Sequence, residues 1–224
     1  EETRYYLNGI YIHKHDKKLI AVATDGHRLA RTSVNLPSGA DLISGVIIPR
    51  KAIYEIRKLI EDYSHDEQVS INLSDSKIRV KISNTIITSK LIDGNFPDYE
   101  KVIPKDNANI VNLDCLVFSE SVDRVSTIFS DKSKSVRLSL SANKLSLEAN
   151  SPDTGSASEE IEITYDKDDI SIGFNSRYLL DVTSQIGSGD LIMALKDSGS
   201  PALISLPNDS ESLFVLMPMR VWYF

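Results

Sequence analysis

The sequence contains very little cysteine and histidine. Cys115 is the only cysteine among 224 residues, and there are four histidines. One thiol excludes an internal disulfide framework and a metal site built from several thiolates. It also fits a reducing compartment, so we expect a cytoplasmic protein. The same scarcity leads us to expect no metal and no cofactor.

Long apolar runs and an excess of positive charge are also lacking. No stretch is apolar for long enough to cross a bilayer as a helix, and no signal-peptide pattern opens the chain. The net charge of -7 argues against a protein that grips nucleic acid over its whole surface, although a local basic face remains compatible with it. The length is sufficient for one large core or two modest ones.

Three segments carry apolar residues at helical spacing and begin roughly sixty residues apart, which indicates an internal repeat. The predicted helices are 49–60, 114–129 and 177–186, the last capped by Asn175 and Ser176. In the first helix, we expect Ile53, Ile56 and Ile60 to face inward. Gly187, Ser188 and Gly189 follow the third helix and are typical of a C-terminal cap.

Each predicted helix is followed by three short stretches in which apolar and polar residues alternate. This pattern is typical of strands in a sheet with one buried and one solvated face. The predicted strands are 69–73, 77–82, 85–91, 135–140, 144–149, 159–165, 191–195, 202–206 and 213–217. The sequence therefore predicts an α+β chain that repeats a unit of one helix and a three-stranded meander.

The first fifty residues contain predicted strands at 5–13, 18–24 and 45–48 with no helix before them. By the logic of the repeat, they form a fourth unit whose helix is missing. The segment 94–99, followed by Pro104, is the best candidate for a linker. We therefore expect two pseudo-twofold domains of two units each, 1–103 and 104–224.

Two short motifs raise the possibility of hydrolysis. Asp25 and His27 lie in a predicted tight turn and could form an acid–base pair that awaits a nucleophile, but no nucleophile motif accompanies them. Asp153 begins the Asp-Thr-Gly tripeptide of aspartic proteases, whose chemistry needs two carboxylates. The tripeptide occurs once, in a polar loop. A hydrolase that uses Asp25 and His27, or Asp153, is therefore the alternative from the enzyme class.

Two histidines raise the possibility of a metal site. His13 and His15 are two residues apart in a predicted strand, so their side chains share a face and could chelate a metal. The charged residues around them are more typical of a solvated strand end.

Two surfaces are better candidates for binding. Arg50, Lys51, Arg57 and Lys58 fall largely opposite the apolar stripe of the first helix, and Tyr5 and Tyr6 could add aromatic contacts to nucleic acid. The other surface is the C-terminal end, where Pro218 removes a backbone donor after the last strand. The flexible thioethers of Met217 and Met219 then suit a surface that repacks against different partners. A last core strand is the alternative reading of this end.

Six motifs together resemble the β sliding clamp of bacterial DNA polymerase III, in order and spacing, over essentially the whole chain. They are RYYLNG at 4–9, ATDGHRLA at 23–30, IPRK at 48–51, GNFPDY at 94–99, GFN at 173–175 and VLMPMR at 215–220. The resemblance implies a DNA-clamp fold of which this chain covers the second and third domains. It implies a head-to-tail ring of two subunits, with helices lining a hole around duplex DNA and sheets outside.

The resemblance also implies function and partners. A clamp of this family catalyses nothing: it tethers the polymerase to DNA, and a separate ATP-driven loader opens the ring. Polymerases, the loader and repair proteins insert short peptides with glutamine, leucine and phenylalanine into an apolar groove between the second and third domains. The residues that match this groove are Leu7, Thr24, Gly26, His27, Arg28, Leu29, Pro97, Lys101, Val102, Pro201, Val215, Leu216, Met217, Pro218, Met219 and Arg220.

Two further groups of residues match functional positions of the family. Tyr5, Tyr6, Arg50 and Lys51 match the residues that face DNA. Thr127 and Ile128 match the subunit contact, although a β-branched pair at that place is equally consistent with a core position. A scaffold that binds partner peptides but no DNA is the alternative within the binding class.

The sequence departs from the family pattern in three ways. The first domain is absent, so this chain alone is not expected to close a ring. Lys101 stands where the best-known members have arginine, which removes a bidentate donor. Trp222, Tyr223 and Phe224 extend past the usual end, and we expect this tail to pack near the groove or in a neighbour's groove.

Overall fold

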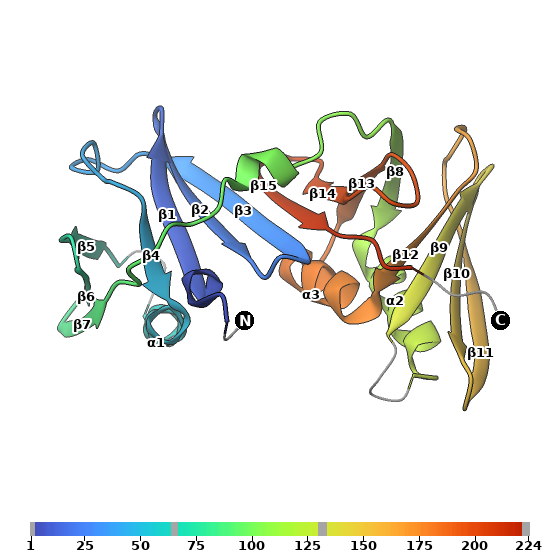
Figure 1. Ribbon diagram of the computed structural model, residues 1–224, viewed down its shortest axis with the longest axis horizontal. Helices are drawn as coiled ribbons and strands as arrows, with labels where there is room; N and C mark the ends of the chain where they lie inside the picture. Colours follow the sequence, from blue (N-terminus) through green and yellow to red (C-terminus); the bar gives the residue numbers. More distant parts are fainter. Residues whose placement is uncertain (1–2, 64–66, 130–133, 221–224) are drawn as a thin grey trace. The chain divides into compact units, whose positions relative to one another are not determined.

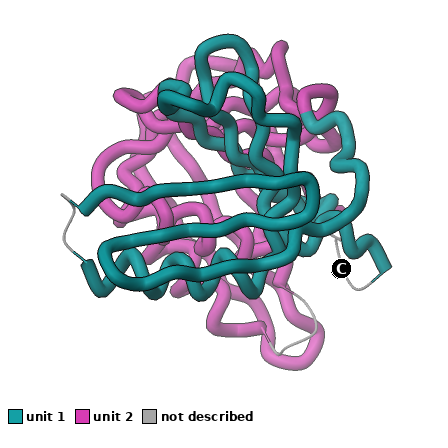
Figure 2. The backbone as a smooth tube through the Cα atoms, turned by 90° about the vertical axis from the view of Figure 1, so that its left-hand side faces the viewer, with its two compact units in different colours: residues 1–99 teal, residues 100–224 magenta. Residues whose placement is uncertain are grey.

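The structure, a computed structural model, describes residues 3–63, 67–129 and 134–220. It divides into two compact units, 1–99 and 100–224 (Figure 2). The division falls at the short 3-10 helix η2 (Tyr99–Val102), whereas the sequence placed the boundary after residue 103. The predicted packing of Trp222, Tyr223 and Phe224 lies outside the described residues.

Unit 1 contains two antiparallel sheets, one α-helix and one short 3-10 helix in its described part (Figure 1). One sheet has the order β4-β1-β2-β3 and the other the order β5-β6-β7. Its elements are η1 (Tyr5–Leu7), β1 (Gly9–His15), β2 (Lys18–Thr24), β3 (Arg28–Asn35), β4 (Val46–Pro49), α1 (Arg50–Glu61), β5 (Val69–Leu73), β6 (Lys77–Ile82) and β7 (Thr85–Lys90).

The core of unit 1 follows from the alternation in β6. Ile78, Val80 and Ile82 are buried while the residues between them are exposed, so one face of β6 packs inward. The buried face joins Ile48 of β4 and Ala52 of α1 in one apolar cluster. The helix packs on the sheets along its length, because Ile53, Ile56 and Leu59 are partly buried against this cluster.

In its described residues, unit 2 contains two α-helices packed on each other and on two antiparallel sheets. The strands run side by side as β11-β10-β9-β12 and as β15-β14-β13-β8 (Figure 1). Its elements are β8 (Asn109–Asp114), α2 (Cys115–Ser126), β9 (Ser135–Ser141), β10 (Lys144–Ser151), β11 (Gly155–Glu162), β12 (Ile170–Asn175), α3 (Ser176–Ile186), β13 (Asp190–Leu195), β14 (Ala202–Leu206) and β15 (Asp209–Leu216). Phe118 of α2 and Leu179 of α3 are both 1% exposed in the shared core.

The repeating unit differs from the predicted one. A strand comes before each helix, so the repeat is strand, helix and three strands; β8 and β12 were not predicted. The third strand of the first meander is β3, which was also missed, and the segment predicted at 45–48 is β4, which leads into α1. Gly173 inside β12 weakens the strand pattern there.

The helix ends agree with their capping chemistry. The Asp114 carboxylate accepts a hydrogen bond from the Val117 N–H at 2.9 Å, and the Asn175 side chain accepts one from the Arg177 N–H at 3.0 Å. Gly187 ends α3 at φ +77° and donates its N–H to the Thr183 carbonyl, as its predicted cap role requires.

Several predicted details were wrong. In α1, Ile53 and Ile56 pack partly buried against the core as predicted, whereas Ile60 is 48% exposed and the buried residue of the helix is Ala52. The segment 5–13 begins as the 3-10 helix η1. The strand predicted at 159–165 is β11, which begins at Gly155, so the polar loop around Asp153 is only a short turn. Among the described residues, no helix is long and apolar enough to cross a membrane.

Candidate functional site

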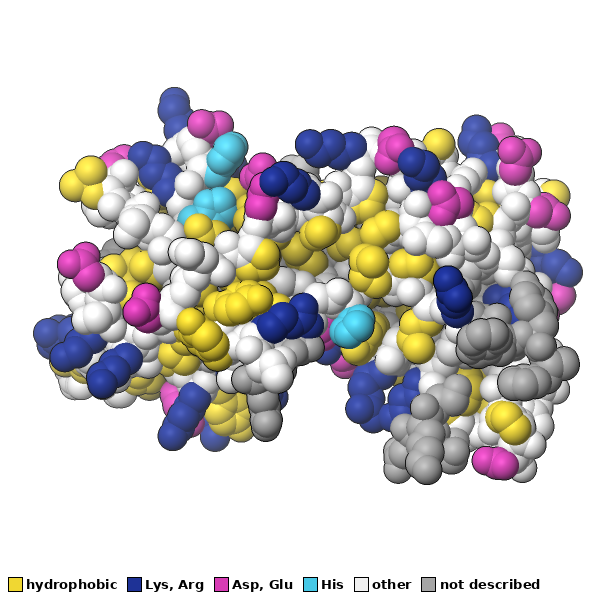
Figure 3. All heavy atoms as spheres, in the orientation of Figure 1, with side chains coloured by type: hydrophobic (Ala, Val, Ile, Leu, Met, Phe, Trp, Pro, Cys, Tyr) yellow, Lys and Arg dark blue, Asp and Glu magenta, His cyan; other side chains and the backbone are white. Residues whose placement is uncertain are grey.

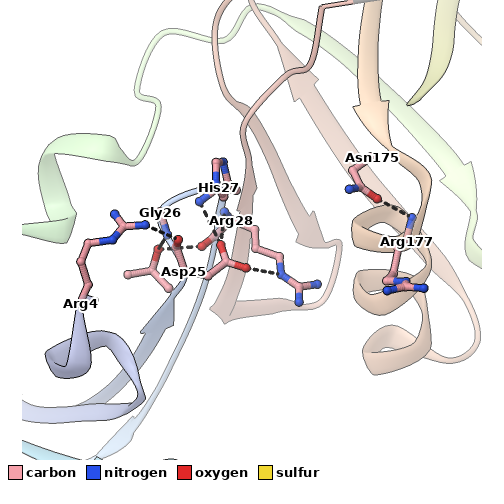
Figure 4. A network of polar contacts seen from close by, with 8 residues as sticks. Arg4, Asp25, Gly26, His27, Arg28, Asn175 and Arg177 are labelled. Atoms are coloured by element: carbon pink, nitrogen blue, oxygen red, sulfur yellow. Dashed lines mark hydrogen bonds and ion pairs between the residues drawn. The ribbon is translucent and has the colours of Figure 1, made fainter. Parts of the chain in front are cut away.

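The hairpin turn between β2 and β3 holds four of the predicted peptide-binding residues, Thr24, Gly26, His27 and Arg28, in one hydrogen-bonded loop (Figure 4). The Thr24 hydroxyl donates to the Arg28 carbonyl at 2.7 Å and accepts from the Gly26 N–H at 3.1 Å. The Asp25 carboxylate accepts from the His27 N–H at 2.9 Å and the Arg28 N–H at 3.0 Å. The turn is therefore fixed by its own polar groups, as expected for Asp-Gly chemistry.

Two arginines brace this turn. The Arg28 guanidinium donates through Nε to the Asp25 carboxylate at 3.1 Å, and Arg4 donates through Nη2 to the Asp25 carbonyl at 3.0 Å. Gly26 lies at φ +86°, and a Cβ added there would lie 2.7 Å from Nη1 of Arg4. Glycine is thus required both by the backbone conformation and by the approach of Arg4.

The Asp25 carboxylate serves the turn. Partial burial raises its pKa, but hydrogen bonds from the His27 and Arg28 N–H groups and from the Arg28 guanidinium outweigh that effect, so the pKa is lowered. A carboxylate held ionised by three donors is poorly suited to accept a proton in catalysis. The contact that Asp25 makes with His27 is to its backbone N–H.

The remaining predicted residues of unit 1 differ in exposure. His27 and Pro97 are exposed, whereas Leu7 and Leu29 are 9% and 4% exposed, so these two leucines lie beneath the surface. Lys101 and Val102, in η2 at the start of unit 2, are exposed.

The C-terminal segment of unit 2 gathers the other predicted peptide-binding residues. β15 ends at Leu216, one residue before the predicted end, and Pro201 immediately precedes β14, which pairs with β15. Beyond Pro218, the Met219 N–H donates to the Gly173 carbonyl of β12 at 2.7 Å. Val215 and Leu216 are buried, whereas Met217 and Met219 are 39% and 42% exposed and Arg220 is exposed. This segment thus presents two exposed thioethers on an ordered backbone.

The residues predicted to face DNA are exposed or partly exposed. Tyr5 is 57% exposed, and its ring meets that of Tyr6 edge-on with centroids 5.8 Å apart. Arg50 and Lys51 are exposed in the first turn of α1, and this turn contains no acidic residue. Helix dipoles are positive at this end, so both charges reinforce an attraction for anions. Figure 3 shows further Lys and Arg side chains around the end of unit 1 where α1, β6 and β7 lie.

The predicted subunit-contact residues lie directly after α2. Thr127 is exposed and donates its hydroxyl to the Arg124 carbonyl at 2.7 Å. Ile128 is partly buried against the core of unit 2, and its carbonyl accepts from the Thr154 hydroxyl. Ile128 thus contributes to the packing of unit 2, whether or not it also contacts a second subunit.

The other catalytic and metal candidates have structural explanations. Asp153 lies exposed in the turn between β10 and β11. The His13 ring is hydrogen-bonded to Tyr99, and His15 lies 3.8 Å from the Asp16 carboxylate on the surface. In the described parts of the chain, no three His, Cys, Asp or Glu residues are grouped to hold a metal ion.

Comparison with known proteins decides the family. Residues 1–98 match the central domain of the DNA polymerase III beta subunit, and residues 100–220 match its C-terminal domain. The chain belongs to the β sliding clamp family. Its α+β fold is accordingly the DNA-clamp fold, and the two matched domains correspond to the two compact units.

Clamps from several bacteria are similar along the whole chain. The clamp of Caulobacter vibrioides is 48% identical over 225 residues, and that of Escherichia coli is 36% identical over 222 residues. A crystal structure of the Bartonella birtlesii clamp bound to griselimycin is 50% identical, with a TM-score of 0.95. Each match covers 99% of this chain and 60% of the relative, so the chain spans about three fifths of a clamp subunit.

Sequence reasoning missed two residues that hold the clamp-family motifs in place. Arg4 braces the turn through the Asp25 carbonyl, and His13 holds the first residue of η2, Tyr99, through its hydroxyl. Both contacts join residues far apart in sequence, so no local pattern indicates them. The position of Arg4 inside the first matched motif was the one available signal.

Proposed function

We propose that this chain is the central and C-terminal part of a DNA polymerase processivity factor. In the full-length protein, two subunits form a head-to-tail ring that encircles duplex DNA, in the cytoplasm, without catalysing a reaction. The observation that carries the proposal is the match of both units, in order, to consecutive domains of one clamp family.

We further propose that the turn 24–29, with Leu7, Pro97, Lys101 and Val102, and the C-terminal segment, with Pro201 and 215–220, contact partner peptides. Exposed apolar side chains on a fixed backbone support this role, because they bury area without a large ordering cost. Met217 and Met219 are exposed although their neighbours Val215 and Leu216 are buried. Flexible thioethers adapt to different apolar anchors, which suits a site shared by the polymerase, the loader and repair proteins.

The proposed DNA-facing residues are Tyr5, Tyr6, Arg50 and Lys51. A sliding protein needs weak, sequence-independent attraction to phosphates, since each tight phosphate contact would slow its movement. A net charge of -7 with Arg50 and Lys51 exposed at the positive end of α1 meets that requirement.

Fluorescence anisotropy tests the peptide site. A labelled peptide with the clamp-binding consensus is titrated with this chain, beside a peptide in which leucine and phenylalanine are alanine. We expect micromolar binding that the altered peptide loses. Equal binding of both peptides, or of neither, would reject the peptide site.

A matched pair of variants locates the site. Met217→Ala should weaken peptide binding about fivefold. The bound peptide is expected to cover roughly half of the Met217 side chain, and the variant loses that apolar contact. Leu116→Ala removes an apolar side chain that is 57% exposed on α2, and it should leave binding unchanged. Equal effects of the two substitutions would show that the peptide binds elsewhere.

Thr127 and Ile128 are proposed to contact the second subunit. In the full-length protein, Thr127→Arg should convert dimers to monomers in sedimentation velocity, whereas Ile110→Asp, at an exposed isoleucine of β8, should not. Because Thr127 is exposed, its substitution spares the core that Ile128→Asp would disturb. Dimers that survive Thr127→Arg would contradict the assignment.

A further inference from the structure

Four aromatic side chains join β1 to the segment that follows β7. The Tyr11 ring stacks on His13, with centroids 4.9 Å apart, and on Phe96, with centroids 4.8 Å apart. His13 Nε2 lies 2.9 Å from the Tyr99 hydroxyl. We call Tyr11, His13, Phe96 and Tyr99 the aromatic clasp. It holds the segment 94–99 where the chain crosses β1 (Figure 1).

The local sequence explains why the clasp forms on this face of β1. Tyr11 and His13 are two residues apart in a strand, so their side chains share a face, while Ile12 points the other way and packs on the core of unit 1. Gly45 gives the Tyr11 ring room, because a Cβ at that position would lie 2.1 Å from the Tyr11 hydroxyl oxygen. Tyr99 is 6% exposed, so the clasp ends in a buried anchor.

The imidazole of His13 can satisfy both of its polar contacts in one neutral form. With the proton on Nδ1, that nitrogen donates to the Lys14 carbonyl at 3.2 Å, and Nε2 accepts from the Tyr99 hydroxyl. The ring therefore contributes both a stacking surface and an acceptor. Phenylalanine at position 13 would keep the stacking surface, and glutamine would keep the hydrogen-bond acceptor.

We propose that His13 is a positioning residue for partner binding. The clasp keeps the segment 94–99 against β1, and Pro97 lies between two of its members, Phe96 and Tyr99. A segment that is already ordered costs less to bind than one that must be fixed by its ligand, so the clasp raises peptide affinity. This inference rests on the proposed peptide-binding function, because Pro97 is one of the proposed contacts.

The test is an anisotropy titration of clasp variants with the consensus peptide. His13→Ala removes the stack and the acceptor together and should weaken binding about tenfold. His13→Phe keeps the ring and His13→Gln keeps an acceptor, so each should restore part of the loss. His15→Ala is the matched control, because His15 lies two residues further along β1, outside the clasp, with a side chain 61% exposed.

The pair His13 and Tyr99 distinguishes positioning from general destabilisation. Tyr99→Phe and His13→Phe both remove the hydrogen bond between these two side chains, so the double variant should bind no more weakly than His13→Phe alone. In nitrogen-15 spectra, the wild-type imidazole should show the Nδ1–H tautomer, and Tyr99→Phe should shift the Nε2 resonance. An Nε2 resonance that stays in place would overturn the clasp itself.

The outcomes separate this inference from the proposed function. If the wild-type chain and His15→Ala bind the peptide and His13→Ala binds equally well, the positioning role is wrong and the peptide site stands. The same holds if His15→Ala weakens binding as much as His13→Ala. If the wild-type chain does not bind the peptide, the proposed peptide site fails, and the positioning role fails with it.

Discussion

Substitution of Gly26 offers a quantitative test of how the β2–β3 turn is held. Gly26 lies at φ +86°, and a Cβ there would lie 2.7 Å from Nη1 and 2.9 Å from Nη2 of Arg4. The same guanidinium donates to the Asp25 carbonyl at 3.0 Å. Gly26→Ala should therefore strain the backbone and also displace Arg4 from its hydrogen bond.

The two costs can be estimated separately. A left-handed conformation costs an L-residue about 1–2 kcal/mol, and loss of the Arg4 hydrogen bond adds about 1 kcal/mol. Gly39 provides the matched control, because it has nearly the same φ, +85°, with no atom within 4 Å of an added Cβ. Gly39→Ala should thus cost only the backbone term, about 1 kcal/mol less than Gly26→Ala.

Urea unfolding measures both costs, and Arg4→Ala identifies their source. In the Arg4→Ala background, the guanidinium is no longer there to be displaced, so Gly26→Ala and Gly39→Ala should reduce the free energy of unfolding equally. Equal costs in the wild-type background would refute the reasoning. A difference between the costs of Gly26→Ala and Gly39→Ala that persists in the Arg4→Ala background would also refute it.

Three further predictions concern the rest of the turn and unit 2. Asn175→Ala removes the cap of α3 and should reduce the free energy of unfolding, measured with urea, by about 1 kcal/mol. Asn112→Ala is the control, because Asn112 is exposed on β8, and it should change this free energy little. Burial, with a smaller effect of the Asp114 charge, raises the pKa of the Cys115 thiol. A chromogenic disulfide reagent should therefore react with this thiol only as the chain unfolds. Rapid reaction of the native chain would contradict this prediction. Because the folded pKa of Asp25 is lowered from 3.8, its stabilising contribution is present above that value and lost as the pH falls through the folded pKa. The stability difference between wild type and Asp25→Asn should thus shrink on acidification below 3.8, and a difference that grows would contradict the assignment.

Much of the fold could be predicted because alternation and helix caps are local. The Asn175 cap and the alternating β6 are set by neighbouring residues, and the structure shows them as predicted. The Asp114 cap is equally local but was not predicted. β3 was missed because its residues are mostly polar, and β8 because only Val111 and Leu113 alternate within it. The exposure of Ile60 depends on what covers the end of α1, which helical spacing does not encode.

The hairpin turn of the candidate site could be predicted from the sequence, whereas the distant residues that hold the site in place could not. Asp25 and Gly26 specify a hairpin turn by themselves, and the structure forms one between β2 and β3. Arg4 is 21 residues away from Asp25, and His13 is 86 residues away from Tyr99. These supports arise only when the chain folds back on itself, so no spacing rule reveals them.

The central proposal is that the full-length protein holds DNA by encircling it. The most direct test loads the protein, with its ATP-driven loader, onto a nicked circular plasmid and measures retention by gel filtration before and after the plasmid is cut once. A closed ring should stay on the circle at high salt and leave through the ends of the linear form. Equal retention on both forms, or release from both by salt alone, would show ordinary phosphate binding and contradict the proposal.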